Sequence, residues 1–430
     1  MIDLNRKYLN ILTTISNIKS PYTEPDQVQE LQKYCLKYLT EHLKEFNVYT
    51  DSSKNIIALP YFLDSTKPLL YLSAHIDTVP GDPAEWTFPF HPYKVYRDKT
   101  QIVARGVNDC KAGVALQLYI AKLIFQNDIK SCNLAFLLTF KEEGSGTKTA
   151  TKLGEAFGMA LPVHSNTTVL VLENTLTVAP TTSLGVYTSE RSSYAIEIEG
   201  TLDFFQKCLH ELKLWYPVAI KSNDSITTST SVVTQEARHV CSTARDENKL
   251  LSIILESDRN AVINAGDLNN FATIPSRIEI GRCNEEVMHK LVLTLRDTIN
   301  YESVVSSLES FQYTEKKPFA LSKGLSGQSN YRENIIYKAL FEDTSISAQN
   351  EINPGASDGS TISAVLSENL KDKILFIVAG PGCRSNKMSV PKRMTHGANE
   401  TFYIQPGIIA VNGITKAIIK AGFLHSYYGG

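Results

Sequence analysis

Residues 69–77 read Leu-Leu-Tyr-Leu-Ser-Ala-His-Ile-Asp, an almost unbroken apolar run that ends in polar side chains. An apolar run without alternation predicts a strand that is covered on both faces of a sheet. Similar runs occur at residues 134–140 and 169–172, and apolar residues recur at helical spacing over residues 31–43 and 114–125. The alternation of buried strands with helices predicts an α/β fold in which helices flank a central sheet.

The pattern changes near residue 181. Residues 194–199 alternate apolar and charged side chains, which is typical of a strand with one wet face. Helical spacing then follows at 202–215 and 285–299, and short strand-like runs at 250–255 and 278–280. The buried-strand pattern returns at 374–379. Because a single core stops growing near ~250–300 residues, we expect a larger domain over 1–180 and 301–430, interrupted by a small α+β insertion at 181–300.

The composition excludes several classes of protein. Lys and Arg number 43 and Asp and Glu number 45, and the net charge of −2 argues against a nucleic-acid binder or a polybasic membrane binder. No run approaches ~18 apolar residues, so no membrane span is predicted. The seven cysteines contain no CxxC, and only Cys208, Cys241 and Cys283 share a neighbourhood, so neither a disulfide framework nor a thiolate zinc site is indicated. Because residues 1–7 also lack the shape of a signal peptide, we expect a protein of the reducing cytoplasm.

Polar side chains gather where the predicted strands end or in the loops that follow them. They are His75, Asp77, Asp109, Glu142, Glu143, Glu173 and, in a late loop, His396. In open α/β sheets, ligands bind at the carboxyl ends of the strands. The gaps from His75 to Asp109 and from Asp109 to Glu143 are each 34 residues, and Glu173 follows 30 residues later. Gaps of this length leave room for the chain to leave the sheet and return as a further strand. These side chains can therefore all lie at the same edge of the sheet.

Each of these residues has a plainer interpretation when it is taken alone. Asp109 could cap the helix that follows it, the glutamates could be solvated at strand ends, His75 could lie in the core, and His396 could lie on the surface. Taken together, carboxylates that repel one another need a reason to gather, and a pair of divalent metal ions supplies one. Imidazole and carboxylate ligands suit zinc, with cobalt or manganese as alternatives.

Five segments carry a resemblance to a known family. They are 73–80, Ser-Ala-His-Ile-Asp-Thr-Val-Pro; 104–113, Ala-Arg-Gly-Val-Asn-Asp-Cys-Lys-Ala-Gly; 142–144, Glu-Glu-Gly; 353–359, Asn-Pro-Gly-Ala-Ser-Asp-Gly; and 396–400, His-Gly-Ala-Asn-Glu. The sequence resembles the co-catalytic zinc metallopeptidases and deacylases, which include acetylornithine deacetylase, succinyl-diaminopimelate desuccinylase, carboxypeptidase G and peptidase T. The resemblance implies a zinc-peptidase-like catalytic domain with a central mixed sheet, interrupted by a smaller α+β lid domain of the dimerisation type.

The resemblance also implies a set of metal ligands. His75, Asp109 and Glu173 would bind one of two divalent ions. Asp109 would bridge to the second ion, which Glu143 and His396 would also hold. The ions would be Zn²⁺, with Co²⁺ or Mn²⁺ as alternatives.

Two further residues would act beside the metals. Asp77 would orient His75 through the far ring nitrogen. Glu142 would be the general base, which takes a proton from the attacking water and delivers it to the leaving amine.

The resemblance implies amide hydrolysis. Because Glu at position 173 accompanies deacylases and carboxypeptidases within the resemblance, we expect a deacylase acting on an N-acyl amino acid. The alternatives are a metallo-carboxypeptidase or dipeptidase acting on short peptides, and a metal-binding protein that has lost turnover. The presence of Glu142 argues against the last, because a metal-binding module needs no general base.

The sequence departs from the family in the lid. The family places a His soon after the first lid strand, where it reaches the partner subunit's active site, whereas here the first is His210, within a predicted helix. His239 could substitute for it from a different loop. The resemblance implies a homodimer through the lid domain, although the lid motif is degenerate in this sequence. Arg277 could hold a substrate carboxylate or be a surface charge. Asp358 and Gly355 could shape the site from a glycine-rich loop or form a simple turn.

Overall fold

The structure, a computed structural model, describes the following residues: 2–143, 147–178, 182–190, 192–200, 226–228, 261–265, 277–283, 286–297, 315–322, 331–342, 347–353, 357–386 and 397–424. Its contacts divide the chain into two units, Met1–Glu190 with Leu325–Gly430, and Arg191–Gly324. These limits differ from the expected insertion at 181–300. Strand β9 (Ser183–Glu190) pairs within the sheet of the first unit, and β15 (Glu315–Ser322) pairs within the second.

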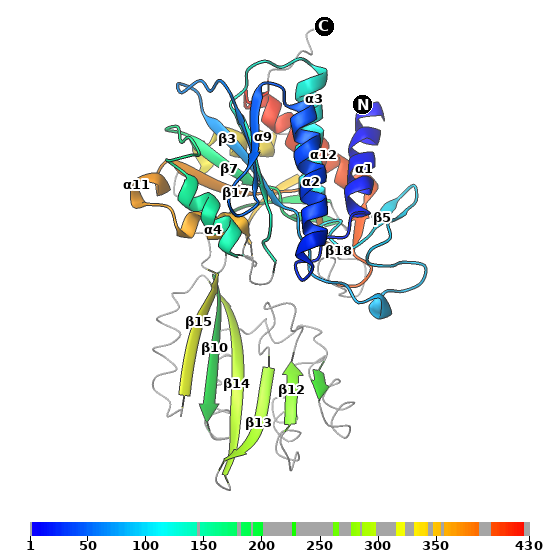
Figure 1. Ribbon diagram of the computed structural model, residues 1–430, viewed down its shortest axis with the longest axis vertical. Coiled ribbons are helices and arrows are strands. Elements are labelled where there is room, and N and C mark those ends of the chain that lie inside the picture. The colour runs from blue at the N-terminus through cyan, green and yellow to red at the C-terminus, as the bar shows by residue number, and fades with distance from the viewer. Residues whose placement is uncertain are drawn as a thin grey trace. The chain divides into compact units, whose positions relative to one another are not determined.

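The first unit is built on a ten-stranded mixed sheet (Figure 1). Its strands, in spatial order, are β1 (Phe46–Thr50), β2 (Ile56–Pro60), β6 (Leu134–Thr139), β3 (Leu69–His75), β7 (Thr167–Val171), β17 (Ile374–Val378), β9, β8 (Leu176–Val178) and β18 (Cys383–Asn386), with β16 (Ser347–Asn353) paired to β9. Strands β6, β3, β7 and β17 run parallel to their neighbours among these four. Strand β2 is antiparallel to both β1 and β6. The mixed α/β sheet flanked by helices is confirmed.

Helices cover both faces of this sheet because successive side chains of a buried strand point to opposite faces. Leu70 and Leu72 pack in one apolar cluster, whereas Leu69 and Tyr71 pack in the other. The first cluster draws on α1 (Ile2–Ser16), α2 (Pro25–His42), α3 (Lys111–Gln126), α9 (Ile335–Glu342) and α12 (Ile404–Lys420). The second draws on α4 (Thr147–Ala156) and α10 (Asp358–Ala364). Within the described part of the chain, none of the helices combines the length and apolarity that crossing a bilayer would need.

Short elements complete the first unit. They are the 3₁₀ turns η1 (Pro83–Glu85) and η3 (Tyr331–Glu333), helix α11 (Glu368–Lys371), and a three-stranded sheet in the order β19 (Thr401–Tyr403), β5 (Gln101–Val103), β4 (Tyr96–Arg97). The pairing of β19 with β5 brings the late residue Glu400 beside the loop that precedes α3. Segments almost 300 residues apart in sequence therefore meet next to the candidate site.

The described strands of the second unit form a six-stranded antiparallel sheet. Its order is β11 (Ile226–Thr228), β12 (Ala261–Ala265), β13 (Arg277–Cys283), β14 (Glu286–Asp297), β10 (Ser192–Gly200) and β15. The strands expected at 194–199 and 278–280 are confirmed in β10 and β13. The helix expected over 202–215 and the strand over 250–255 lie outside the described residues.

The helix expected over 285–299 is wrong, because the described residues of this segment, Glu286–Asp297, form strand β14. Leu291, Leu293 and Leu295 follow one another at every second residue, which suits a strand. Leu291 and Leu295 are also four residues apart, which suits a helix equally well. Strand β14 pairs with β10 on one side and with β13 on the other. Because hydrogen-bonded neighbours are available on both sides, the tertiary context favours the strand over the helix.

Candidate metal centre

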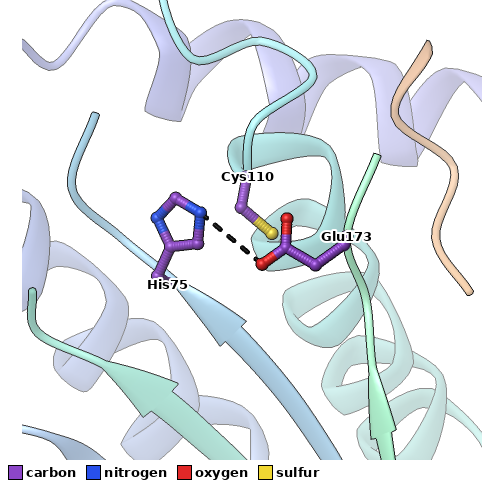
Figure 2. A group of neighbouring side chains, drawn as sticks. All are labelled: His75, Cys110 and Glu173. Atoms are coloured by element: carbon purple, nitrogen blue, oxygen red, sulfur yellow. Dashed lines mark ion pairs between the residues drawn. The ribbon is translucent and has the colours of Figure 1, made fainter. Parts of the chain in front are cut away.

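The candidate ligands come from the carboxyl ends of three parallel strands and from one loop. His75 is the last residue of β3 and lies opposite Thr139 at the end of β6, with Glu142 and Glu143 just beyond. Glu173 comes two residues after the end of β7. Parallel strands present their carboxyl ends at the same sheet edge, so the sequence spacing converts into spatial proximity. Figure 2 shows His75 and Glu173 facing each other, with Cys110 beside them.

His75 is fixed so that one ring nitrogen is available to a cation. The ring is buried, and its Nδ1 lies 3.0 Å from the main-chain oxygen of Asp77 and 3.2 Å from the Asp77 Oδ1. Its Nε2 lies 3.0 Å from Asp109 Oδ1 and 3.7 Å from Glu173 Oε1. With the proton held on Nδ1 by Asp77, the lone pair of Nε2 faces the two carboxylates.

Asp77 also fixes the segment that carries the two glutamates. Its carboxylate is fully buried, and its Oδ1 accepts a hydrogen bond from the backbone N–H of Glu142 at 2.9 Å. Its Oδ2 accepts one from the backbone N–H of Glu143 at 3.0 Å. One carboxylate therefore sets both the ring of His75 and the backbone from which Glu142 and Glu143 project.

Two sets of three donor groups lie close enough together to hold metal ions. One set is His75, Asp109 and Glu143, and the other is His75, Cys110 and Glu173; within each set the ligand atoms lie within 4.8 Å of one another. His75 belongs to both sets, so the two positions adjoin. Nitrogen, oxygen and sulfur donors at such spacing fit a divalent transition metal.

The charges of this cluster call for a cation. Burial raises the pKa of Glu173 well above its usual value, and Asp109 raises it further. Burial likewise raises the pKa of Glu142, with Glu143 adding to the effect. Burial lowers the pKa of His75, but its acidic neighbours and Cys110 outweigh this and raise it overall. Each of these pKa shifts reflects the cost of holding several negative charges together in a buried place, and a bound divalent ion would lower that cost.

The Asp109 loop differs from its plainer interpretation as a helix cap. The N-cap residue of α3 is Cys110, and its side chain makes no capping hydrogen bond. The Asp109 carboxylate instead meets the ring of His75. One oxygen of Asp109 is thus directed at the cluster.

Asp358 is a further buried carboxylate beside the cluster. It is 1% exposed at the start of α10, and neither of its oxygens has a hydrogen-bond partner of normal geometry among the described residues. Burial raises its pKa to about 6, although His75 and the nearby Thr139 hydroxyl lower it. An unsatisfied buried carboxylate is costly to maintain, which favours a functional role over the simple turn.

Glu400 was missed among the site residues, although it ends a segment that the sequence singles out. Its Oε2 accepts a hydrogen bond from the Gly106 N–H at 2.8 Å. Its Oε1 accepts bonds from the N–H groups of Asn108 and Asp109 at 2.9 and 3.2 Å. The buried Glu400 carboxylate therefore holds the loop that presents Asp109.

Arg105 extends this arrangement to the segment that bears His396. Its Nη1 donates to Glu400 Oε2 at 3.2 Å and to the main-chain oxygen of Gly397 at 3.0 Å. Gly397 follows His396, which lies outside the described residues. Nothing local in the sequence marks this pair, because its partners lie more than 290 residues apart.

Glu190, at the end of β9, is another acidic group that the sequence interpretation missed. It is buried, and its Oε2 accepts a hydrogen bond from the Ser357 N–H at 3.2 Å, just before Asp358. The expected boundary at 181 had assigned this residue to the insertion, so no strand end was considered there. Of the remaining candidates, Gly355 and His239 lie outside the described residues, and Arg277 begins β13 in the second unit.

The family of the chain follows from a match over most of its length. The model of the family described as Peptidase family M20/M25/M40 matches residues 71–402, which include every described candidate ligand. The chain belongs to this family of peptidases and related hydrolases of amide bonds. The resemblance that the five segments carry is confirmed.

Individual relatives match over shorter segments. The chain is 32% identical over 132 residues to an uncharacterized metallohydrolase of Methanocaldococcus jannaschii, over 29% of the chain and 30% of the relative. It is 29% identical over 124 residues to a succinyl-diaminopimelate desuccinylase of Rickettsia bellii, over 26% of the chain and 32% of the relative. The match thus spans about a third of the length of these curated relatives.

A solved structure shows the fold over the full length. The M20 family metallo-carboxypeptidase of Sulfolobus solfataricus aligns with a TM-score of 0.59 and 15% identity, over 97% of this chain and 100% of that one. At this identity the likeness establishes the fold alone. It confirms the zinc-peptidase-like architecture that the segments implied.

Proposed function

We propose that the protein is a dinuclear metal-dependent hydrolase that cleaves an amide bond, deacylating an N-acyl amino acid. One observation carries the proposal. His75 turns its Nε2 toward Asp109 and Glu173, while Asp77 holds both that ring and the backbone of Glu142. Ligands and a candidate base are thus oriented by a single buried carboxylate.

His75, Asp109 and Glu173 would hold one ion, and Asp109, Glu143 and His396 would hold the other. The structure supports the gathering of these ligands, because His75 lies within 4.8 Å of ligand atoms of Asp109 and Glu143 in one donor set and of Glu173 in the other. Zn²⁺ suits these donors, with Co²⁺ or Mn²⁺ as alternatives. When bound, such ions polarise the scissile carbonyl and make the attacking water more acidic.

Glu142 would do the proton work of the reaction. Its carboxylate would accept a proton from the attacking water and deliver it to the nitrogen of the leaving amine. The raised pKa of Glu142, which burial and Glu143 cause, suits a base that must hold the proton between these two steps. Asp77 would serve as a positioning residue through its bond to the Glu142 N–H.

The substrate class follows from the resemblance at one position. Glu173 is the residue that accompanies deacylases and carboxypeptidases, and one curated relative carries the name succinyl-diaminopimelate desuccinylase. A metallo-carboxypeptidase or dipeptidase that acts on short peptides is the second candidate. A similarity over a short segment to a relative named probable carboxypeptidase supports this candidate.

The second unit would act as the lid and dimerisation domain. Its described strands form one antiparallel sheet with β15 and β11 at the ends of the order. Edge strands offer unpaired backbone groups to another chain. Light scattering would test the homodimer: twice the 47.8 kDa chain mass is expected, and a mass of one chain would contradict it.

The cytoplasm is the proposed location. Cys35, Cys110, Cys132 and Cys383, the cysteines of the first unit, are all buried free thiols. Free thiols persist in a reducing compartment. Fractionation of the source cells would test this, because a protein found only outside the cytoplasm would contradict it.

Substrate profiling tests the function directly. The protein would be loaded with zinc, cobalt or manganese and offered N-acetyl and N-succinyl amino acids beside dipeptides. Faster hydrolysis of the acyl amino acids is expected. Faster hydrolysis of dipeptides would transfer the assignment to the second candidate, and two bound metals with no hydrolysis of any substrate would indicate a metal-binding protein without turnover.

A further inference from the structure

Cys110 lies beside the ligands that the resemblance assigns to one metal ion, yet it has no role in that assignment. It follows Asp109 directly and its side chain is fully buried. Its Sγ, a ring nitrogen of His75 and a carboxylate oxygen of Glu173 all lie within 4.8 Å of one another. Figure 2 shows the sulfur on the side of the Glu173 carboxylate that His75 also approaches.

We propose that Cys110 is a sulfur donor to the metal ion held by His75 and Glu173. This inference rests on the proposed function, because it concerns the same ion. It changes the chemistry of that position from nitrogen and oxygen alone to nitrogen, oxygen and sulfur. The second position, with Glu143 and without the thiol, would keep oxygen and nitrogen donors.

The distances are close to what a shared ion requires. Two donors of one tetrahedral zinc ion lie roughly 3.6 Å apart, given a zinc–sulfur bond of ~2.3 Å and a zinc–nitrogen bond of ~2.1 Å. The Nε2 of His75 lies 3.7 Å from the Oε1 of Glu173. The Sγ of Cys110 lies within 4.8 Å of a ring nitrogen of His75 and of a carboxylate oxygen of Glu173.

A structural role for the thiol is the competing explanation. The Sγ lies 3.1 Å from the main-chain oxygen of Leu172, to which the S–H donates. Cys110 also belongs to the larger apolar cluster. A thiol that only fills space and satisfies Leu172 would not need a histidine nitrogen and a carboxylate oxygen as neighbours, whereas a ligand would.

On ligation, the thiol of Cys110 would lose its proton and bind the metal ion, with no change in oxidation state. The S–H bond breaks, the proton passes to solvent, and a sulfur–metal bond forms with both electrons from sulfur. Thiolate is a soft ligand, so the position would favour zinc or cadmium over manganese. The open choice among zinc, cobalt and manganese is thereby narrowed for this one position.

X-ray absorption of the zinc-loaded wild-type protein tests the proposal without any variant. One sulfur shared among two zinc ions should appear as about half a sulfur per zinc at ~2.3 Å. A first coordination sphere that contains only nitrogen and oxygen would overturn the proposal. Because no substitution is made, this measurement does not depend on a variant that folds.

Cobalt-loaded variants identify which sulfur is involved. The wild-type protein should show a near-ultraviolet sulfur-to-cobalt charge-transfer band, and Cys110→Ser should lose it. Cys35→Ser is the matched control, because Cys35 is equally buried in the same apolar cluster, and it should keep the band. A band that persists in Cys110→Ser, or is absent from the wild type, would contradict the assignment.

Competition between metals gives a quantitative measure. Cys110→Ser should reduce the preference for cadmium over manganese by at least about tenfold at the affected position. An unchanged preference would count against ligation. These measurements need no substrate, so a protein that shows sulfur ligation but hydrolyses nothing would overturn the proposed function alone. An active protein without sulfur ligation would overturn the role of Cys110 alone.

Discussion

Two kinds of buried carboxylate lie within the larger unit, and they differ in what satisfies them. Asp77 and Glu400 each accept hydrogen bonds from backbone N–H groups, and Glu400 also pairs with Arg105. Among the described residues Asp358 has no such partner of normal geometry, and burial raises the pKa of Glu173 well above its usual value, further than it raises the pKa of Glu400. The protein itself supplies the hydrogen bonds that stabilise the charge of the first kind, whereas the charge of the second kind requires a bound cation or a proton.

This difference separates the scaffold of the site from its reactive face. The scaffold carboxylates hold the loops that present Glu142, Glu143 and Asp109. Of the reactive carboxylates, Glu173 lies 3.7 Å from the Nε2 of His75. Substitutions in the two groups should therefore fail in different ways, the scaffold through stability and metal affinity and the reactive face through chemistry.

The largest effect is expected from removal of the proposed base. Glu142→Ala should lower the rate of amide hydrolysis by about 10²–10⁴-fold, because it removes the group assigned to take the proton. Both metal ions should remain, since Glu142 is not assigned as a ligand. Steady-state rates and metal content measured on the same sample check this, and near wild-type activity would remove Glu142 from its role.

The scaffold should respond in stability. Glu400→Gln leaves Arg105 buried without its charge partner, and breaking a buried pair of this kind costs about 3–5 kcal/mol. Urea unfolding of the metal-free protein measures the loss. Lys371→Gln is the control, because its pair with Glu368 is exposed and should contribute less than about 1 kcal/mol. Equal losses in the two variants would show that the Glu400 pair is not a scaffold.

Asp358 should give a pH-dependent effect of the opposite sign. Burial raises its pKa to about 6 from an ordinary 3.8, so its charged form destabilises the metal-free fold as the pH rises from about 4 to above 6. Asp358→Asn removes this penalty and should stabilise the protein by about 3 kcal/mol at pH 7.5, and by about half as much at pH 5. Unfolding free energies at both pH values test this. A variant that is less stable than the wild type at pH 7.5 would contradict it.

The smallest effect is expected at the residue that orients His75. Asp77→Asn keeps the shape of the side chain but weakens its hold on Nδ1, and loss of such a partner lowers metal affinity by roughly 10–100-fold. Titration with a competing chelator measures the affinity. A variant with unchanged affinity would show that the ring of His75 is oriented without Asp77.

The strands of the larger unit could be predicted because their signal is local. Residues 69–74 are almost wholly apolar, and burial on both faces requires this of a central strand. The segment 285–299 could not be predicted in the same way. Its leucines fit both a helix and a strand, and only the pairing of β14 with β10 and β13 decides the outcome.

The site divides in a similar way. His75, Glu143 and Glu173 could be predicted because each follows or ends a buried strand. Cys110 gave no such signal, since a thiolate zinc site is normally recognised by closely spaced cysteines. Its neighbours His75 and Glu173 lie 35 and 63 residues away in the sequence (110−75 and 173−110), so only the fold brings them together.

Metal content per chain tests the central claim most directly, because every assigned role depends on two ions held by named ligands. The wild-type protein should bind two ions per chain by elemental analysis. His75→Ala and His396→Ala should each bind about one, since each histidine is assigned to a single ion. Two ions per chain in either variant would contradict the ligand assignment.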